Sequence, residues 1–370
     1  MNPVSVYVHI PFCPSKCGYC DFNSYAMTGE IVDRTTAAIL SEIRKSPWAG
    51  RPAKTIFFGG GTPTFLEAQD QIEILNAIME AHPPTADCEI TSEANPGTVD
   101  QSKFAALRQA GFNRISLGGQ SFAPEELKQL GRVHGQGDIH RAVYAAHEAG
   151  FENINLDLMF ALPGQTLARW KSNLDFALQL PVNHLSLYCL TIEPNTRFHK
   201  LHQRGLLEVL DEDRQTEMYD LAASRCAENG FEHYEISNFC KPGFQSRHNL
   251  AYWRCEEYLA YGPGAVGCFD DGEGRHRYTN LKHPTGYSKA VESGANLWCE
   301  HEILTDENRR LEQLMMGLRL SEGVSISGLP IDQSELQKLV HRGWLNAESD
   351  RLKLTDEGRH FCSEVALCLA

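Results

Sequence analysis

The feature that most constrains the fold of this chain is the alternation of short apolar runs with amphipathic stretches in its first half. The apolar runs are rich in β-branched residues and occupy residues 4–10, 54–58, 88–94, 114–118, 153–159 and 184–190. The stretches between them carry apolar residues at helical spacing over residues 31–46, 66–82, 100–110, 138–149 and 166–180. Such a pattern predicts βαβ units that form a parallel sheet with right-handed crossovers.

Six βα units are too few for a closed eight-stranded barrel, so we predict an α/β fold with a partial (βα)6 barrel in residues 1–230. Any site should then lie at the C-terminal ends of the strands. Residues 231–302 lose the regular alternation, and we expect a mixed region of short strands and loops there. Residues 303–370 read as helix, helix, hairpin and helix, which predicts a winged-helix-like C-terminal module.

Composition narrows the class of protein. The formal net charge is −14, which disfavours a broad nucleic-acid-binding surface because phosphate would be repelled. Modification of nucleic acid is a third possible function, but only the winged-helix-like C-terminal module suggests it. That module has no dense row of lysine and arginine residues. No apolar run is long enough for a membrane span, and no secretory signal is evident, so we expect a cytoplasmic protein with reduced cysteines.

Three of the twelve cysteines stand together directly after the first apolar run, with the spacing C-x3-C-x2-C. These are Cys13, Cys17 and Cys20. A [4Fe–4S] cluster held by three thiolates would leave one iron open for a small molecule. A zinc ion bound by three cysteines and a histidine, either His9 or a distant one, is the main alternative, and no metal is a third. Most of the other nine cysteines are interpreted as small buried hydrophobic residues.

The spacing of these cysteines after the first strand of a βα barrel resembles the radical S-adenosylmethionine (SAM) superfamily. Tyr19 matches the aromatic residue that usually precedes the last cysteine. Further motifs follow later strands: FFGGGTP, SEANPG, SLGGQSF, LGRVH and NLDLMFALPGQT. The resemblance implies that the three cysteines hold [4Fe–4S] and that the methionine amino and carboxylate groups of SAM chelate the fourth iron.

The resemblance also implies a set of SAM-binding residues. Carboxylates and an amide suit the ribose hydroxyls, and an arginine suits the methionine carboxylate. Any one of these polar residues alone would more simply be an ordinary barrel-rim residue, but this reading weakens when five follow successive strands. The implied residues are Tyr7, Tyr19, Phe22, Gly59, Gly60, Gly61, Thr62, Glu93, Gln120, Arg132 and Asp157.

Within the superfamily, the ordered motifs resemble the group around oxygen-independent coproporphyrinogen III dehydrogenase. Phe22 stands where that enzyme carries a fourth cysteine, and we also expect no N-terminal extension like the enzyme's, because three residues precede Val4. HNLAYW matches the H-N-x-x-Y-W motif of the haem chaperones of this group. The resemblance therefore implies haem binding by the side chains of His248, Tyr252 and Trp253. The alternative is that His248 and Asn249 form hydrogen bonds within a loop, while Tyr252 and Trp253 pack in a hydrophobic core.

Two functions follow from the resemblance. The first is a haem chaperone that binds haem, [4Fe–4S] and SAM and delivers haem to membrane-bound respiratory haemoproteins. The second is SAM-dependent oxidative decarboxylation of coproporphyrinogen III to protoporphyrinogen IX. The residue at position 22 favours the chaperone, and no catalytic residue is assigned. We expect an electron donor such as flavodoxin or ferredoxin as a partner. We also expect a homodimer and transient contact with the membrane, but no binding of nucleic acid.

Overall fold

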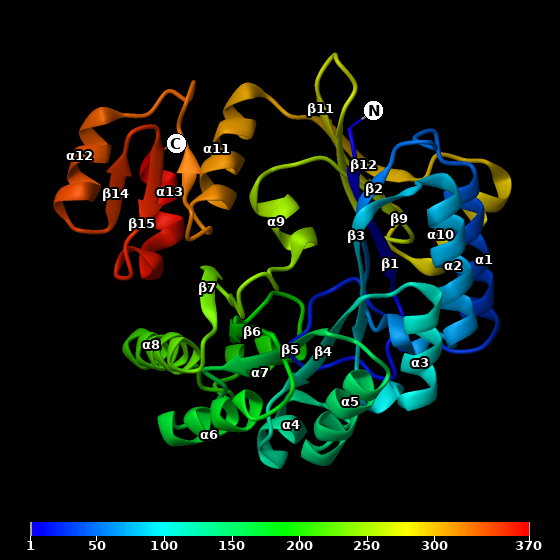
Figure 1. The fold of residues 1–370 in the computed structure, drawn as a ribbon, viewed down its shortest axis with the longest axis horizontal. Helices are drawn as coiled ribbons and strands as arrows, with labels where there is room; N and C mark the ends of the chain where they lie inside the picture. Colours follow the sequence, from blue (N-terminus) through cyan, green and yellow to red (C-terminus); the bar gives the residue numbers. More distant parts are fainter. Residues whose placement is uncertain (1, 370) are drawn as a thin grey trace.

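A computed structural model describes residues 2–369, and its centre is a curved parallel sheet built from the predicted apolar runs (Figure 1). The strands pair in chain order, each parallel to the next. Every predicted run lies on one of them, with boundaries that differ by at most four residues. The six strands are β1 (Val4–Ile10), β2 (Ala53–Gly60), β3 (Pro84–Ala94), β4 (Arg114–Gln120), β5 (Asn153–Phe160) and β6 (His184–Cys189).

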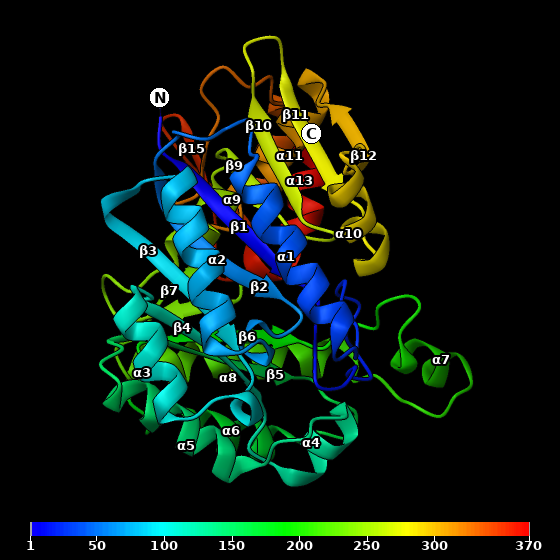
Figure 2. The ribbon, with the colours of Figure 1, turned by 90° about the vertical axis from the view of Figure 1, so that its right-hand side faces the viewer.

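Helices cover the outer, convex side of this sheet (Figures 1 and 2). Five of them match the predicted stretches, and α3 ends as expected at Gly111, which adopts a left-handed conformation. A further short helix, α4, begins at Pro124 and was not predicted. The helices are α1 (Glu30–Arg44), α2 (Ala68–Ala81), α3 (Gln101–Ala110), α4 (Pro124–Leu130), α5 (Gln136–Glu148) and α6 (Leu167–Leu178), with 3-10 turns η1 (Pro63–Phe65) and η2 (Pro96–Thr98).

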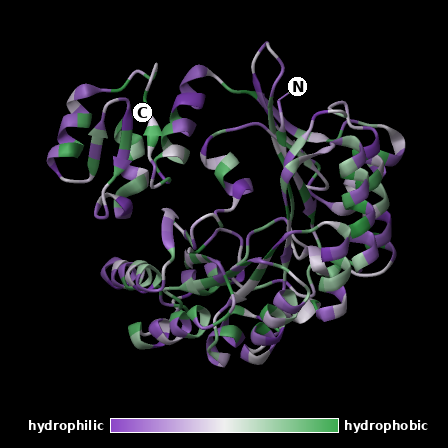
Figure 3. Cartoon of the chain, in the orientation of Figure 1, coloured by the Kyte–Doolittle hydropathy of each residue, from purple (hydrophilic) through white to green (hydrophobic). Residues whose placement is uncertain are grey.

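The strands alternate between an apolar outer face and a polar inner face, because successive side chains of a strand point to opposite sides. In β1, Val4, Val6 and Val8 are fully buried in the core beneath the helices. Tyr7 and His9 alternate with them and face the inside of the barrel. Figure 3 shows mainly hydrophobic colours on the strands and mixed colours on the surrounding helices. The main core thus lies between sheet and helices, and polar and aromatic side chains face the barrel interior.

Residues after β6 add short strands to both edges of the same sheet. The strand order is β12-β11-β10-β9-β1-β2-β3-β4-β5-β6-β8-β7, in which β9 is parallel to β1 and β8 is antiparallel to β6. Helix α9 lies on the concave side of the sheet (Figure 1). These elements are α7 (Arg197–Gln203), α8 (Glu212–Glu228), β7 (Glu232–Glu235), β8 (Asn238–Cys240), α9 (Arg247–Trp253), β9 (Tyr258–Tyr261), β10 (Val266–Asp270), β11 (Arg275–Asn280), α10 (Pro284–Ser293) and β12 (Trp298–Ile303).

The C-terminal residues form a small module with its own apolar core beside the barrel (Figure 1). Its sheet has the order β13-β15-β14, and the predicted hairpin is β14 and β15. Leu314, Leu352 and Val365 are fully buried between this sheet and the helices. The elements are α11 (Asp306–Gly317), β13 (Val324–Ser325), α12 (Gln333–His341), β14 (Leu345–Glu348), β15 (Arg351–Leu354), η3 (Gly358–Phe361) and α13 (Cys362–Leu369).

Within residues 2–369, no helix combines the length and the hydrophobicity that crossing a membrane requires.

Candidate functional site

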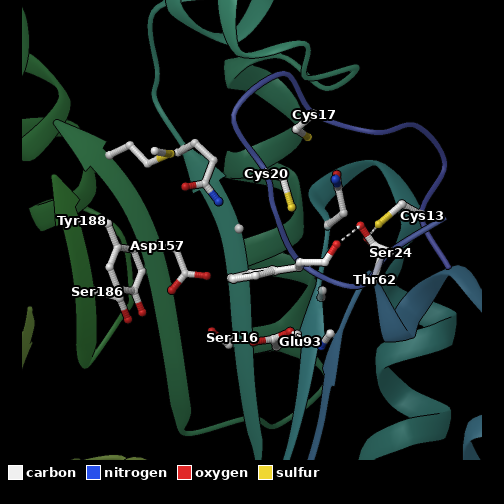
Figure 4. A pocket seen from close by; sticks show the side chains of 18 of the residues that line it. Cys13, Cys17, Cys20, Ser24, Thr62, Glu93, Ser116, Asp157, Ser186 and Tyr188 are labelled. Carbon is white, nitrogen blue, oxygen red and sulfur yellow. Dashed lines mark hydrogen bonds between the residues drawn. The ribbon is translucent and has the colours of Figure 1, made fainter. Parts of the chain in front are cut away.

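A cavity of about 570 Å³ opens inside the curve of the barrel and reaches the C-terminal ends of its strands. Its volume falls within the range of about 300–1,000 Å³ that is usual for ligand pockets. The loop after β1, the inner faces of β1 to β6 and helix α9 all contribute side chains to its wall. Figure 4 shows the three predicted cysteines on one side of this cavity and the polar strand residues across from them.

Internal hydrogen bonds close the loop that carries the cysteines. The backbone N–H of Cys13 donates to the carbonyl of Tyr25 (3.0 Å), and the N–H of Tyr25 donates to the carbonyl of Pro11 (2.7 Å). Lys16 Nζ reaches across the loop and donates to the carbonyls of Phe22 (2.6 Å) and Ser24 (3.2 Å). The three cysteines are therefore held on one compact loop at the cavity wall.

The three thiols are free and partly buried, and all three line the cavity. Burial raises the pKa of the Cys13 and Cys20 thiols, although the Thr62 hydroxyl, which lies 3.5 Å from Cys13 Sγ, acts in the opposite direction. Such thiols ionise when they bind a cation, because metal coordination removes the thiol proton. This donor set fits a metal group that needs three thiolates.

A preformed mononuclear zinc site is not found. Across residues 2–369, no three or more histidine, cysteine, aspartate and glutamate side chains are placed to hold one metal ion. His9 in particular uses both ring nitrogens, since Nε2 is bonded to the carbonyl of Asn23 (2.8 Å) and Nδ1 to the Tyr7 hydroxyl (3.0 Å). Burial lowers the pKa of His9 to about 4. With both ring nitrogens engaged, His9 is not free to serve as the fourth ligand of a zinc ion.

The glycine-rich turn after β2 packs directly against the cysteine loop. Gly61 N–H donates to the carbonyl of Ile10 (2.8 Å), and a Cβ on Gly61 would lie 2.6 Å from the carbonyl oxygen of Phe12. Gly60 has a φ of 109°, and a Cβ there would lie 2.5 Å from the His9 ring. Gly60, Gly61 and Thr62 line the cavity, whereas Gly59 does not appear in its wall. These glycines are needed first to seat the cysteine loop.

The two predicted carboxylates, Glu93 on β3 and Asp157 on β5, face the cavity (Figure 4). Glu93 Oε2 accepts a hydrogen bond from the Gly60 N–H (3.1 Å), and Asp157 Oδ1 accepts one from Asn155 Nδ2 (2.7 Å). Burial, reinforced by the negative charge of Asp157, raises the pKa of Glu93 to about 8. Burial also raises the pKa of Asp157. Glu93 is therefore mainly protonated at neutral pH and can donate a hydrogen bond.

The predicted arginine and amide lie in the same cavity, close to the cysteine loop. Arg132 Nη2 donates to the Tyr19 hydroxyl (2.8 Å), and its guanidinium carbon lies 6.0 Å from the centre of the Tyr19 ring. Arg132 Nε is buried without a hydrogen-bond partner, so this guanidinium retains donor capacity. Gln120 has a φ of 66°, an uncommon conformation for a residue other than glycine, at the end of β4.

Besides Tyr19, the other two predicted aromatic residues, Tyr7 and Phe22, also line the cavity. Tyr7 is stacked on Phe57 with ring centres 6.2 Å apart, and both rings line the inner wall. Phe22 lines the outer part of the wall, and its side chain is exposed at 63% despite being apolar. An exposed phenylalanine beside the cysteines forms an apolar edge at the entrance.

Helix α9 brings the predicted haem motif partly into this cavity. His248 is buried, and its Nδ1 and Nε2 are hydrogen-bonded to Thr55 Oγ1 (2.7 Å) and the Tyr252 hydroxyl (2.9 Å). Burial, aided by nearby positive charges, lowers the pKa of His248 to about 3, so the imidazole is neutral. Tyr252 also lines the cavity, but Trp253 does not; the Arg319 guanidinium lies 4.5 Å over its ring instead.

Sequence reasoning missed the inner strand positions that complete the wall. The alternation of polar and apolar residues along each strand carried a signal for several of them, but most of the predicted site residues lie at the C-terminal ends of the strands or in the turns that follow. The most unusual of these residues is Arg114, which opens β4 and is only 2% exposed. The others are Ser116, Asn155, Met159, Ser186 and Tyr188.

Comparison with known proteins identifies the family of this chain. Residues 7–177 match the model of the Radical SAM superfamily, and residues 304–361 match the HemN C-terminal domain. The chain is 38% identical to Heme chaperone HemW of Bacillus subtilis, covering 98% of this chain and 97% of that protein. It is 37% identical to Heme chaperone HemW of Escherichia coli, covering 99% and 97%. The chain belongs to the HemW family of radical SAM proteins.

This chain shares its fold with a solved structure. Coproporphyrinogen III oxidase (HemN) from Escherichia coli superposes with a TM-score of 0.83 over 99% of this chain and 90% of that one, at 22% sequence identity. The predicted α/β radical SAM fold and the predicted family are thereby confirmed.

Proposed function

We propose that this protein is a haem chaperone that binds haem, a [4Fe–4S] cluster and SAM, and delivers haem to respiratory haemoproteins. The observation that carries the proposal is that the cysteine loop and His248 line one and the same cavity. Relatives at 35–39% identity that bear the name Heme chaperone HemW support it.

The cysteine-loop side of the cavity would hold the cluster and SAM. Cys13, Cys17 and Cys20 would bind three of the irons. Arg132 would pair with the SAM carboxylate through its unused donor capacity, because a guanidinium matches a carboxylate in shape and charge. When bound, the cluster and SAM supply one-electron chemistry.

Polar residues of the strand ends would hold the remainder of SAM. The protonated Glu93 would donate one hydrogen bond and accept another at a ribose hydroxyl, and Asp157 and Gln120 would accept and donate nearby. Gly60, Gly61 and Thr62 would leave room for the methionine amino group beside the cysteine loop.

The inner side of the cavity would receive haem. Since Thr55 holds Nδ1 of His248, Nε2 is the nitrogen that would bind iron once the Tyr252 hydroxyl gives way. The low pKa of His248 helps, because no proton competes with the metal. Trp253 lies outside the cavity wall, so the rings of Tyr7, Phe57 and Tyr252 are better placed to cover the macrocycle.

The proposal includes several partners. An electron donor such as flavodoxin or ferredoxin would reduce the cluster, and client haemoproteins of the respiratory chain would receive haem during transient contact with the membrane. We also propose that the protein forms a homodimer and acts in the cytoplasm. The 22% identity to the coproporphyrinogen oxidase supports a common fold only, and Phe22 replaces the fourth cysteine of the dehydrogenase signature, so oxidation of coproporphyrinogen is not favoured.

Haem titration of the anaerobically reconstituted protein tests this proposal. Absorbance should report one bound haem per chain, with an affinity that falls at least about tenfold in His248→Ala. His140→Ala removes an exposed histidine of α5 and should behave like the wild type. With coproporphyrinogen III, SAM and a reductant, no protoporphyrinogen IX should form. Efficient turnover without haem binding would reject the chaperone function.

A further inference from the structure

Arg114 is a buried charge for which the fold supplies no partner. It is 2% exposed, and among residues 2–369 its side chain forms no ion pair and donates no hydrogen bond. Burying a charge in this way is expensive unless a counter-ion arrives. Its guanidinium borders the cavity already described, so the missing partner can enter from that side.

The neighbours of Arg114 do not satisfy it. On β4 the next inward-facing residue is Ser116, which is hydrogen-bonded to Asn155 (2.7 Å). Beside Arg114 on β3 stands Thr91, whose buried hydroxyl also lacks a hydrogen-bond partner. The positive charge of Arg114 partly offsets the raised pKa values of Glu93 and Asp157. Neither carboxyl group forms an ion pair with Arg114. The Arg114 guanidinium and the Thr91 hydroxyl therefore belong to paired positions of neighbouring strands, and both have unused hydrogen-bond donors.

The position of Arg114 separates it from the SAM-binding residues. It is the first residue of β4, whereas Gln120 is the last. Six residues of strand at roughly 3.3 Å each place them about 20 Å apart along the barrel. Arg132, near the cysteine loop, already provides a guanidinium for the single carboxylate of SAM. Arg114 is therefore available to a second anion at the deep end of the cavity.

The cavity wall indicates which kind of molecule carries that anion. The rings of Tyr7, Phe57, His248 and Tyr252 form a continuous aromatic surface, with the Phe57 and His248 rings stacked at 4.9 Å. Arg114 and His248 both line this cavity, so they share one interior space. A flat apolar ring system with an attached carboxylate matches an aromatic wall that ends at a buried guanidinium.

We propose that Arg114 binds a propionate carboxylate of the tetrapyrrole at the deep end of the barrel. This inference rests on the proposed function, since it names the contact that orients the haem. The acidic chain offers few other attractions for an anionic ligand, so Arg114 would provide much of the selectivity for the acid form.

The test compares metal-free protoporphyrin IX with its dimethyl ester, which is equal in ring shape but lacks the charged groups. Fluorescence titration should show that the wild type binds the diacid at least about tenfold more tightly than the ester. Arg114→Gln should remove this preference and Arg114→Lys should keep part of it. Arg141→Gln, at an exposed position on α5, should leave it unchanged. Circular dichroism and thermal unfolding verify the fold of each variant.

Each contrary result has a distinct meaning. Equal binding of diacid and ester by the wild type overturns the inference without any variant, and leaves the haem proposal standing if haem itself binds. Loss of SAM binding in Arg114→Gln, with the porphyrin preference retained, would assign this residue to SAM and also overturn it. Failure of the wild type to bind haem or either porphyrin would refute the proposed function together with the inference.

Discussion

Burial determines the chemistry of the individual residues at this site. The side chains of Glu93 and His248 are both neutral near pH 7, one because its pKa is raised and the other because its pKa is lowered. The motifs identified these positions, but the protonation states depend on burial and on neighbours from distant parts of the chain, such as Asp157 for Glu93 and Arg114 for His248. Sequence reasoning therefore located these residues and could not assign their charge.

At the cysteine loop, replacement of one thiol should remove the cluster. Cys20→Ser should lose most of its iron and sulfide and its broad absorbance near 400 nm, since two remaining thiolates hold the cluster poorly. Cys299→Ser changes an exposed cysteine on β12 and should retain both. A Cys20→Ser protein with full iron content, or a wild type that is colourless and contains stoichiometric zinc, would contradict the assignment.

Glu93 should make stability fall as pH rises. Its pKa is raised from 4.5 to about 8, so between these values the native state holds a proton that the unfolded state has lost. The free energy of unfolding should then decrease with pH by up to about 1.4 kcal/mol per unit across this window. Denaturant titrations from pH 5 to 8 should show a shallower slope for Glu93→Gln. An identical slope in both proteins would show that this carboxyl is ionised throughout.

The strand–turn elements show where sequence reasoning succeeded and where it stopped. The six apolar runs predicted the strands, and the stretches between them predicted five of the helices, because apolar runs and helical spacing are local signals. The turn at Gly61 was predicted to admit a ligand, yet its nearest neighbour is the backbone of Phe12. A contact between two turns some fifty residues apart leaves no local signal in either. Arg114 was overlooked for a related reason, because a charge at the first position of a strand resembles an ordinary strand boundary.

The glycine turn should therefore tolerate no side chain. Gly61→Ala would place a Cβ 2.6 Å from a backbone oxygen of the cysteine loop, and we expect a loss of about 1–3 kcal/mol in unfolding free energy together with a reduced iron content. Gly286→Ala, in α10 with no atom within 4 Å of the new Cβ, should be neutral or slightly stabilising. Chemical denaturation and iron analysis measure both, and normal cluster loading in Gly61→Ala would argue against this close packing.

Across the whole molecule, one sheet joins segments that the sequence placed in separate regions. Strand β9 pairs with β1, and β8 pairs with β6, so the mixed region continues both edges of the barrel sheet. Pairing between strands some 250 residues apart follows from tertiary packing and has no signature in either strand alone. The C-terminal module is tied to this body by Arg319, which contacts the buried Glu235 (3.3 Å) and the Trp253 ring.

Arg319 should thus be important for holding the module in place. Arg319→Gln leaves Glu235 buried without its cation, and we expect a loss of about 3 kcal/mol and faster hydrogen exchange in β7 and α9. Arg309→Gln, on the exposed side of α11, should match the wild type. Unchanged exchange in the Arg319 variant would mean that other contacts hold the module.

Transfer of haem to a recipient protein shows whether the cavity carries haem as cargo. The reconstituted protein, loaded with one equivalent of haem, is mixed anaerobically with membrane vesicles that contain haem-free respiratory haemoproteins, and the client's absorbance is followed. We predict that wild type transfers its haem faster than free haem is acquired, and that His248→Ala gives no acceleration. Haem that stays on the protein, or is acquired no faster than free haem, would contradict the account.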